Sequence, residues 1–197
     1  MSRAEKIRDL IGDVALPLMG FFLWNWGLYF ILIYFMLDQL SRTVFLPWRL
    51  KLTNLNPFEK RKIIIRSFLL FFVEVFLVHI FIKTLLPSIQ FQKEISSFFH
   101  YSDMGIEQGY ILLPLLVVGE WLRLKQDLRM GIVGVRQIVI LQRNKKLSFF
   151  RISFFAFFLG LLFWLPLNER IMAVCFFLFI SLLVLMPIKI NAATPKT

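Results

Sequence analysis

Two ionisable residues, Glu74 and His79, lie inside the long apolar stretch Ile63–Leu86. A helix of this length can cross the roughly 30 Å of hydrocarbon in a bilayer, where ionisable side chains are rare and commonly functional. The position of Glu74 in this stretch is consistent with two roles for its side chain, and the sequence leaves both open. Glu74 is either a proton or cation site, or a protonated acid that forms a hydrogen bond between helices.

Glu74 and His79 are not expected to bind each other. Five residues at about 100° each separate their side chains by about 140° around the helix, and His79 lies about 7.5 Å further along the axis. Each side chain must therefore find a partner on another helix or face a water-filled cavity. For His79 we favour an interhelical hydrogen bond over a proton relay.

Two more acids, Asp38 and Glu120, complete the candidate buried polar or proton-binding residues. Glu120 is followed three residues later by Arg123, which favours a local salt bridge worth about 0.2–0.5 kcal/mol. His100 is the only other histidine and Cys175 the only cysteine. No nucleophile–base set, nucleotide motif or clustered set of metal ligands is recognisable, so we predict no catalytic residue, no metal site and no cofactor.

The composition indicates where these residues must be placed. The chain has 197 residues, of which 58% are hydrophobic and 17% aromatic, whereas soluble domains are about 45–50% apolar. The pattern predicts an all-α, polytopic transmembrane helix bundle in a single domain, residues 1–197, with about five spans. An amphipathic surface segment is expected first, followed by the spans, at residues 1–14 and then 15–40, 63–86, 106–124, 148–167 and 170–190.

Two shorter segments are expected to be helical without crossing the bilayer. Met130–Gln142 is apolar but too short to span, so an interfacial helix fits it best. Within Ser88–Gln108, the spacing of Phe91, Ile95 and Phe98 predicts a partly buried surface helix.

The first apolar run admits two interpretations, because its near-apolar character continues beyond the length that one straight span needs. The helix could be a single tilted span over Ala15–Leu37. Alternatively, a break at Pro17 or Asn25–Gly27 could create a short re-entrant arm followed by a full span over Leu28–Leu46. Asp38 is an ordinary interfacial acid in the first case and lies near the middle of the bilayer in the second.

The distribution of charge predicts the topology. Ser41–Arg66 and Arg123–Lys146 each contain seven Lys or Arg residues, whereas Ser88–Gln108 between them contains one. Positive loops remain in the cytoplasm, so we predict a multi-pass protein of the bacterial cytoplasmic (inner) membrane with a cytoplasmic C-terminus. A lipid-facing basic cluster is expected to attract anionic lipids on that side, through Lys60, Arg61, Lys62, Arg143, Lys145 and Lys146. The formal charge of +11 then needs no nucleic-acid partner.

A family resemblance supports the second interpretation of the first run. Leu16-Pro17-Leu18-Met19-Gly20, Asn25-Trp26 and Tyr34-Phe35-Met36-Leu37-Asp38-Gln39 together resemble the start of an uncharacterised domain-of-unknown-function family of bacterial polytopic membrane proteins. In that family a Pro-rich arm and a Gly-Trp turn precede an aromatic pair followed by Glu-Asn, where this chain has Asp38-Gln39. Phe76-Leu77-Val78-His79 is similar to the family's next span, with Ile80 in place of an aromatic residue. The resemblance implies the hairpin and no particular activity.

Three functions remain. We favour a non-enzymatic, membrane-embedded subunit or structural protein that packs against a partner membrane subunit or forms a homo-oligomer. The alternative is a small proton- or ion-coupled transporter that uses Glu74 and His79, together with Asp38 if the first run is broken. A lipid-modifying enzyme is least favoured, because no nucleophile or metal set is recognisable.

Overall fold

The computed structural model describes residues 15–24, 26–100, 108–129, 131, 134–165 and 167–185. Within these ranges the regular structure is entirely α-helical, which confirms the all-α part of the predicted fold class. The predicted surface segment 1–14 lies outside the described residues. The helices are α2 (Leu16–Leu23), α3 (Leu28–Val44), α4 (Leu46–Lys51), α5 (Pro57–Leu85), α6 (Phe91–Phe99), α7 (Gln108–Arg129), α8 (Val135–Leu162) and α9 (Glu169–Leu185).

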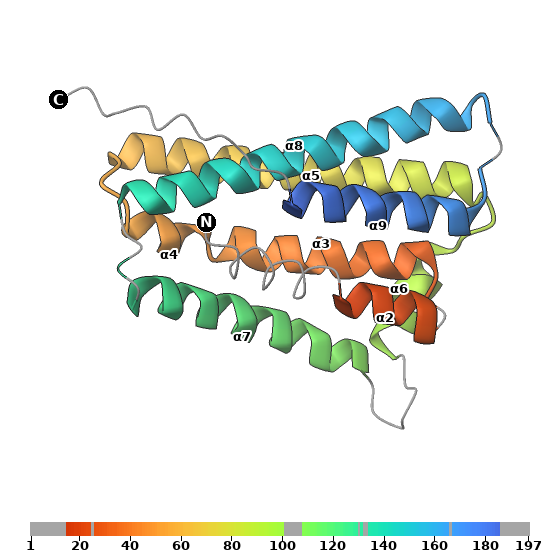
Figure 1. Cartoon of the computed structure of the whole chain (residues 1–197), viewed down its shortest axis with the longest axis horizontal. Helices are drawn as coiled ribbons and strands as arrows, with labels where there is room; N and C mark the ends of the chain where they lie inside the picture. The colour runs from red at the N-terminus through yellow and green to blue at the C-terminus, as the bar shows by residue number, and fades with distance from the viewer. Residues whose placement is uncertain are drawn as a thin grey trace.

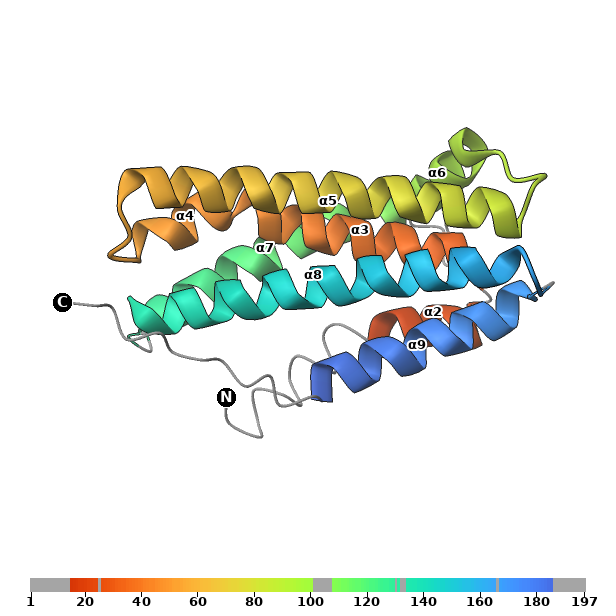
Figure 2. The same ribbon diagram turned by 90° about the horizontal axis from the view of Figure 1, so that it is seen from above.

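Helix α3 is the centre of the bundle. It contacts α5, α7 and α9 along its length and α2 and α6 near its start, while α5 packs along α8. The long helices run roughly parallel to one axis and alternate in direction (Figure 1), and α3 lies behind α5 and α8 when the molecule is seen from above (Figure 2). The N-terminal half of α3 is accordingly buried, with Leu28, Ile31 and Leu32 almost completely inaccessible.

The first apolar run is broken into two helices. Helix α2 ends at Leu23 and α3 begins at Leu28, and the Trp26 amide donates a hydrogen bond of 2.9 Å to the Gly20 carbonyl. The Trp26 ring lies directly against Gly20, where an added Cβ would be 2.2 Å from the ring. Trp26 is therefore a buried core residue.

The stretch around Glu74 and His79 forms the longest helix, α5. Its start follows from local chemistry, since Asn56 accepts a hydrogen bond of 2.7 Å from the Glu59 amide and Pro57 occupies the first turn. Among the described residues, two stretches are long and apolar enough to cross a membrane, Leu28–Lys51 and Pro57–Leu85. The other predicted spans correspond to α7, α8 and α9, whose crossing of a membrane stays a prediction.

The separate interfacial helix expected at Met130–Gln142 is not formed. Helix α8 begins at Val135 and continues without interruption to Leu162, so it includes both the end of that segment and most of the predicted fourth span. The break occurs earlier, at Gly134, whose φ of 63° favours glycine. No proline or glycine lies between Val135 and Phe158 to interrupt the helix. The polar first half and the apolar second half therefore form one continuous helix. The surface helix expected after Ser88 is present as α6, with Phe98 fully buried.

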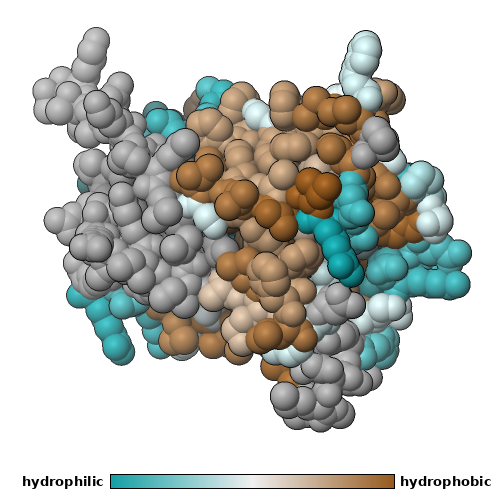
Figure 3. All heavy atoms as spheres, turned by 45° about the vertical axis from the view of Figure 1, so that its right-hand side comes forward, coloured by the Kyte–Doolittle hydropathy of each residue, from teal (hydrophilic) through white to brown (hydrophobic). Residues whose placement is uncertain are grey.

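Large apolar side chains cover much of the outside of the bundle. They include Leu69, Phe72 and Phe76 on α5, and Phe157 on α8, each more than half exposed. Most of the apolar window of α5 lies outside the interior of the bundle. The space-filling view shows such side chains gathered over one face of the molecule (Figure 3).

The contact between Gly20 and Trp26 leads to a first prediction. Gly20→Ala should lower the melting temperature of the detergent-purified protein, since overpacking a filled site costs about 1–3 kcal/mol. Gly160→Ala is the matched control, because nothing lies within 4 Å of a Cβ added there. That variant should melt at the same or a slightly higher temperature, given the helix propensity of alanine. Equal melting temperatures for the two variants would contradict the close contact.

Candidate functional site

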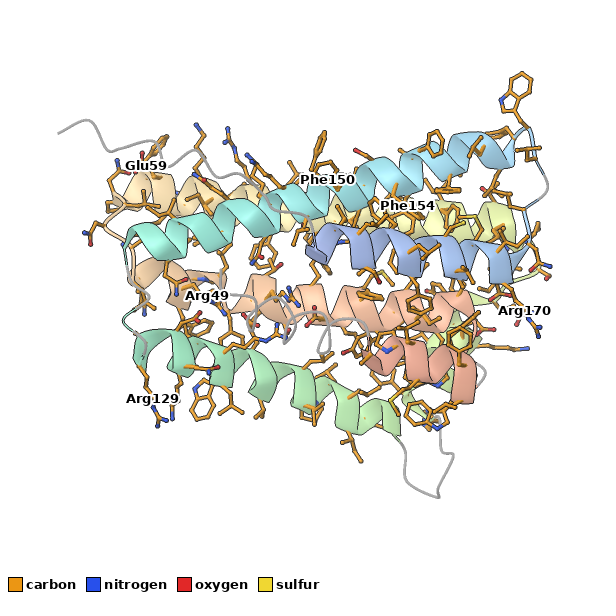
Figure 4. The ribbon with its side chains drawn as sticks, in the orientation of Figure 1. Arg49, Glu59, Arg129, Phe150, Phe154 and Arg170 are labelled. Carbon is orange, nitrogen blue, oxygen red and sulfur yellow. The ribbon has the colours of Figure 1, made fainter. Side chains whose placement is uncertain are left out.

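A buried ionic cluster joins α4, α7 and α8, and Arg49 is its centre. The Arg49 guanidinium donates to the Glu120 carboxylate from Nη2 at 2.7 Å and from Nε at 3.0 Å. Its Nη1 donates to Asp127 at 2.7 Å, and Gln137 donates to the same carboxylate oxygen at 3.4 Å. All four residues are buried. Figure 4 shows Arg49 between the ribbons of α4 and α7.

The helices account for this geometry. Glu120 and Asp127 are seven residues apart on α7, so they lie two turns apart on one face. Arg49 reaches both because α4 starts anew after α3, with Pro47 in its first turn. Two carboxylates facing one guanidinium, with its fixed fork of donors, give a cluster of short charged hydrogen bonds.

The local salt bridge expected for Glu120 is present but secondary. Arg123 lies 3.8 Å from Glu120 Oε2, whereas Arg49 is 2.7 Å from Oε1. Arg123 is also more exposed than Arg49, so the attraction to Arg123 is better screened by solvent. Sequence reasoning missed both Arg49 and Asp127. The spacing of Glu120 and Asp127 on one helical face was the signal that could have found Asp127.

A second polar cluster joins α3, α5 and α8, and Glu74 belongs to it. Arg151 Nε donates to Glu74 Oε1 at 2.6 Å, and Arg151 Nη2 lies 3.4 Å from Glu74 Oε2. The same Nη2 donates to the Gln39 side-chain oxygen and, at 3.2 Å, to Ser148 Oγ. Gln39 also donates to Ser148 at 3.1 Å, which closes the cluster.

Arg151 lies close to the inner end of the predicted span 148–167, a position that predicts a side chain extended toward the membrane surface. The structure shows this prediction to be wrong. The Arg151 side chain is only 18% exposed and turns inward to Glu74, whose side chain is 8% exposed. A buried carboxylate attracts a guanidinium strongly because little solvent competes for either group. Sequence reasoning also missed Gln39 and Ser148 as partners, since neither lies in a pattern that a single helix reveals.

His79 lies apart from this cluster. Its Nε2 is 3.1 Å from the Tyr29 hydroxyl, and its Nδ1 is 2.8 Å from the carbonyl oxygen of Val75. A carbonyl oxygen only accepts, so Nδ1 carries a hydrogen, and in the neutral ring Nε2 accepts from Tyr29. The Phe91 ring packs 5.0 Å away, centroid to centroid. Both ring nitrogens are thus used by groups of the chain itself, and the contact with Tyr29 joins α5 to α3.

Asp38 forms an ion pair of 2.8 Å with Arg42, one turn further along α3. Both side chains are partly exposed, at 19% and 24%. Asp38, Glu74 and His79 therefore have three different partners and do not converge on one point. Asp38 and the Glu74 partner Arg151 do, however, line one common cavity.

This cavity has a volume of about 440 Å³ and lies between α3, α4, α5, α8 and α9. Its lining combines apolar side chains such as Phe35 and Leu70 with six basic and two acidic residues. The acidic residues are Asp38 and Glu59, and the basic residues are Arg42, Arg49, Lys62, Arg66, Lys145 and Arg151. The volume falls within the about 300–1,000 Å³ usual for small-molecule sites.

The predicted basic cluster is divided by this cavity. Lys62 and Lys145 line it, whereas Lys60, Arg61 and Lys146 are not part of the lining. The backbone of Arg143 belongs to α8, but its side chain lies outside the part of the chain that the structure describes.

No protein-family model matches this chain, and no curated protein and no solved structure matches it either. The resemblance to an uncharacterised membrane family thus stays a prediction. Within the described ranges, no group of three or more His, Cys, Asp or Glu side chains is arranged to hold a metal ion.

The fork geometry at Arg49 generates the second prediction. Arg49→Lys keeps the charge, but an ammonium cannot match the guanidinium's bonds to both Glu120 and Asp127. The variant should lose about 2 kcal/mol of stability, the value of one charged hydrogen bond left unmade. Arg129→Lys, at the exposed end of α7 (Figure 4), is the control and should be neutral. Thermal unfolding in detergent measures both, and equal melting temperatures would count against the bridging role.

Proposed function

We propose that this chain is a multi-pass protein of the bacterial cytoplasmic membrane that acts as a non-enzymatic, membrane-embedded subunit or structural protein. One observation carries this proposal. The buried charges are bound to one another in fixed ionic contacts between helices, Arg49 to Glu120 and Asp127, and Arg151 to Glu74. Groups held in this way position helices and are not poised for chemistry on a substrate.

The membrane location is supported by the surface of the bundle. Exposed apolar side chains on α5, α7, α8 and α9 would aggregate in water and suit a hydrocarbon environment. On α7 these exposed side chains include Leu115 and Leu122, and on α9 they include Leu178 and Leu182. This surface favours the expected number of about five spans.

The orientation is supported by the loops. The loop before α5 and the loop before α8 touch, because the Gly134 amide donates to the Leu52 carbonyl at 2.8 Å. Both predicted basic regions therefore meet at one end of the bundle (Figure 1), which we assign to the cytoplasm. Helices α2 and α3 are antiparallel neighbours, and α2 ends and α3 begins at the opposite end of the bundle (Figure 1). We propose that α2 is the re-entrant arm expected before the full span of α3.

The subunit proposal predicts an assembly larger than one chain of 23.4 kDa. The protein should stay in the membrane fraction after an alkaline carbonate wash. After extraction from native membranes in mild detergent, light scattering should give a defined mass of two or more chains, or of the chain with a stoichiometric partner. A monodisperse single chain at every detergent concentration would contradict the proposal, as would release from the membrane by carbonate.

A proton- or ion-coupled transporter is the second candidate. It is favoured by the common cavity, because Asp38 and Arg151 both line it and Glu74 binds Arg151. His79 is not part of this lining, so it has no role in this version of the proposal.

The transporter candidate predicts that the purified protein in liposomes dissipates a pH or ion gradient. Glu74→Gln should abolish the flux, since it removes the charge that Arg151 balances. His79→Gln is the matched control, in another interface, and should retain the flux. If the wild-type protein carries no flux under proton, sodium and potassium gradients, the transporter candidate is eliminated and the subunit proposal is unaffected.

A further inference from the structure

We propose that the cavity between α3, α5 and α8 binds the phosphate headgroup of an anionic phospholipid, through Lys62, Arg66 and Lys145. This inference rests on the proposed membrane location. It goes beyond a general attraction of basic loops to anionic lipids, because it assigns one discrete site with an inner wall, a charged rim and a ligand class.

The charges of the lining support an anionic ligand. Three of the basic residues already have carboxylate partners within the chain, namely Arg42, Arg49 and Arg151. Lys62, Arg66 and Lys145 are exposed and form no hydrogen bond or ion pair with any described residue. The cavity therefore retains three cations that nothing in the described chain neutralises.

The positions of these cations make the same point. Lys62 and Arg66 are four residues apart on α5, so they lie on one face, and like charges at this spacing repel. Lys145 comes from α8, the helix that packs along α5. An anion between the two helices would convert this repulsion into three charged hydrogen bonds.

The two acids of the lining do not neutralise these three cations. Asp38 is bound to Arg42. Glu59 is exposed in the first turn of α5 (Figure 4), where its backbone amide binds Asn56.

The apolar lining favours a lipid over a soluble anion. The cavity is lined, beside the cations, by the apolar side chains of Phe35, Leu70, Ile180 and Leu183. Free phosphate has no apolar part that could pack against them, whereas a lipid does. Beyond the rim, Leu69 and Val73 lie three and seven residues after Arg66, so they share its face of α5. Both are exposed, at 62% and 39%, and could contact an acyl chain. Basic pockets between transmembrane helices on the cytoplasmic side commonly bind anionic lipid headgroups.

The test is native mass spectrometry of the full chain in a zwitterionic detergent, with phosphatidylglycerol, phosphatidylcholine or inorganic phosphate added separately. Phosphatidylglycerol should bind as one retained molecule per chain and raise the melting temperature, while phosphatidylcholine should not. The triple variant Lys62→Gln/Arg66→Gln/Lys145→Gln should bind phosphatidylglycerol roughly 100-fold more weakly.

The matched control is Lys60→Gln/Arg61→Gln/Lys146→Gln, which removes two lysines and one arginine from the same two helices outside the lining. It should keep the affinity within a few-fold of wild type. As an independent variant, Ser67→Phe retains every charge but fills part of the cavity, and it should also weaken binding.

Equal losses in the two triple variants would overturn the discrete site and leave only general surface attraction. Inorganic phosphate that stabilises the chain as well as phosphatidylglycerol does would assign the cations to a soluble anion and overturn the lipid. Retention of phosphatidylglycerol by both the cavity triple variant and Ser67→Phe would overturn the site itself. These readouts use the purified chain, so they are independent of whether a partner subunit exists.

Discussion

The cost of burying charge is the constraint on which this structure depends. Arg49 and Arg151 enter an apolar bundle, where an isolated ion would lose several kcal/mol of hydration. Each can remain only if an acid on a different helix meets it, Glu120 and Asp127 for the first and Glu74 for the second. These pairs therefore specify how α4 faces α7 and how α5 faces α8.

Helix α3 connects the two ionic clusters to each other. Its N-terminal end is capped by a side chain from α9, since the Leu28 amide donates to Glu169 Oε1 at 2.8 Å. The negative charge of this carboxylate also interacts favourably with the positive end of the helix dipole. Its middle contributes Gln39 to the Arg151 cluster, and α4, which follows it, contributes Arg49. A single central element thus connects the turn at Gly20 and Trp26, the two ionic clusters and the wall of the cavity.

The cations of the bundle therefore fall into two groups, those bound by acids of the chain and those without such a partner among the described residues. The inward-facing cations are bound by acids of the chain, whereas Lys62, Arg66 and Lys145 remain at the mouth of the cavity, on the side where the basic loops meet. The first group holds the helices together, and the second can bind a ligand without weakening the fold. His79 belongs to neither group, because Tyr29 and the Val75 carbonyl satisfy both of its ring nitrogens.

The sequence by itself determined the helical class, the start of α5 at Asn56-Pro57 and the clustering of cations in two loops, whereas it left the break before Leu28 as one of two alternatives. These features depend on hydropathy, capping and turn residues within one or two helical turns, so local chemistry is sufficient to predict them. Helical geometry likewise separated Glu74 from His79. Only the tertiary structure decided that Glu74 meets Arg151 and that Asp127 has a role. Such pairings depend on the order and rotation of helices that are far apart in the chain, and those are set by the packing of the whole bundle.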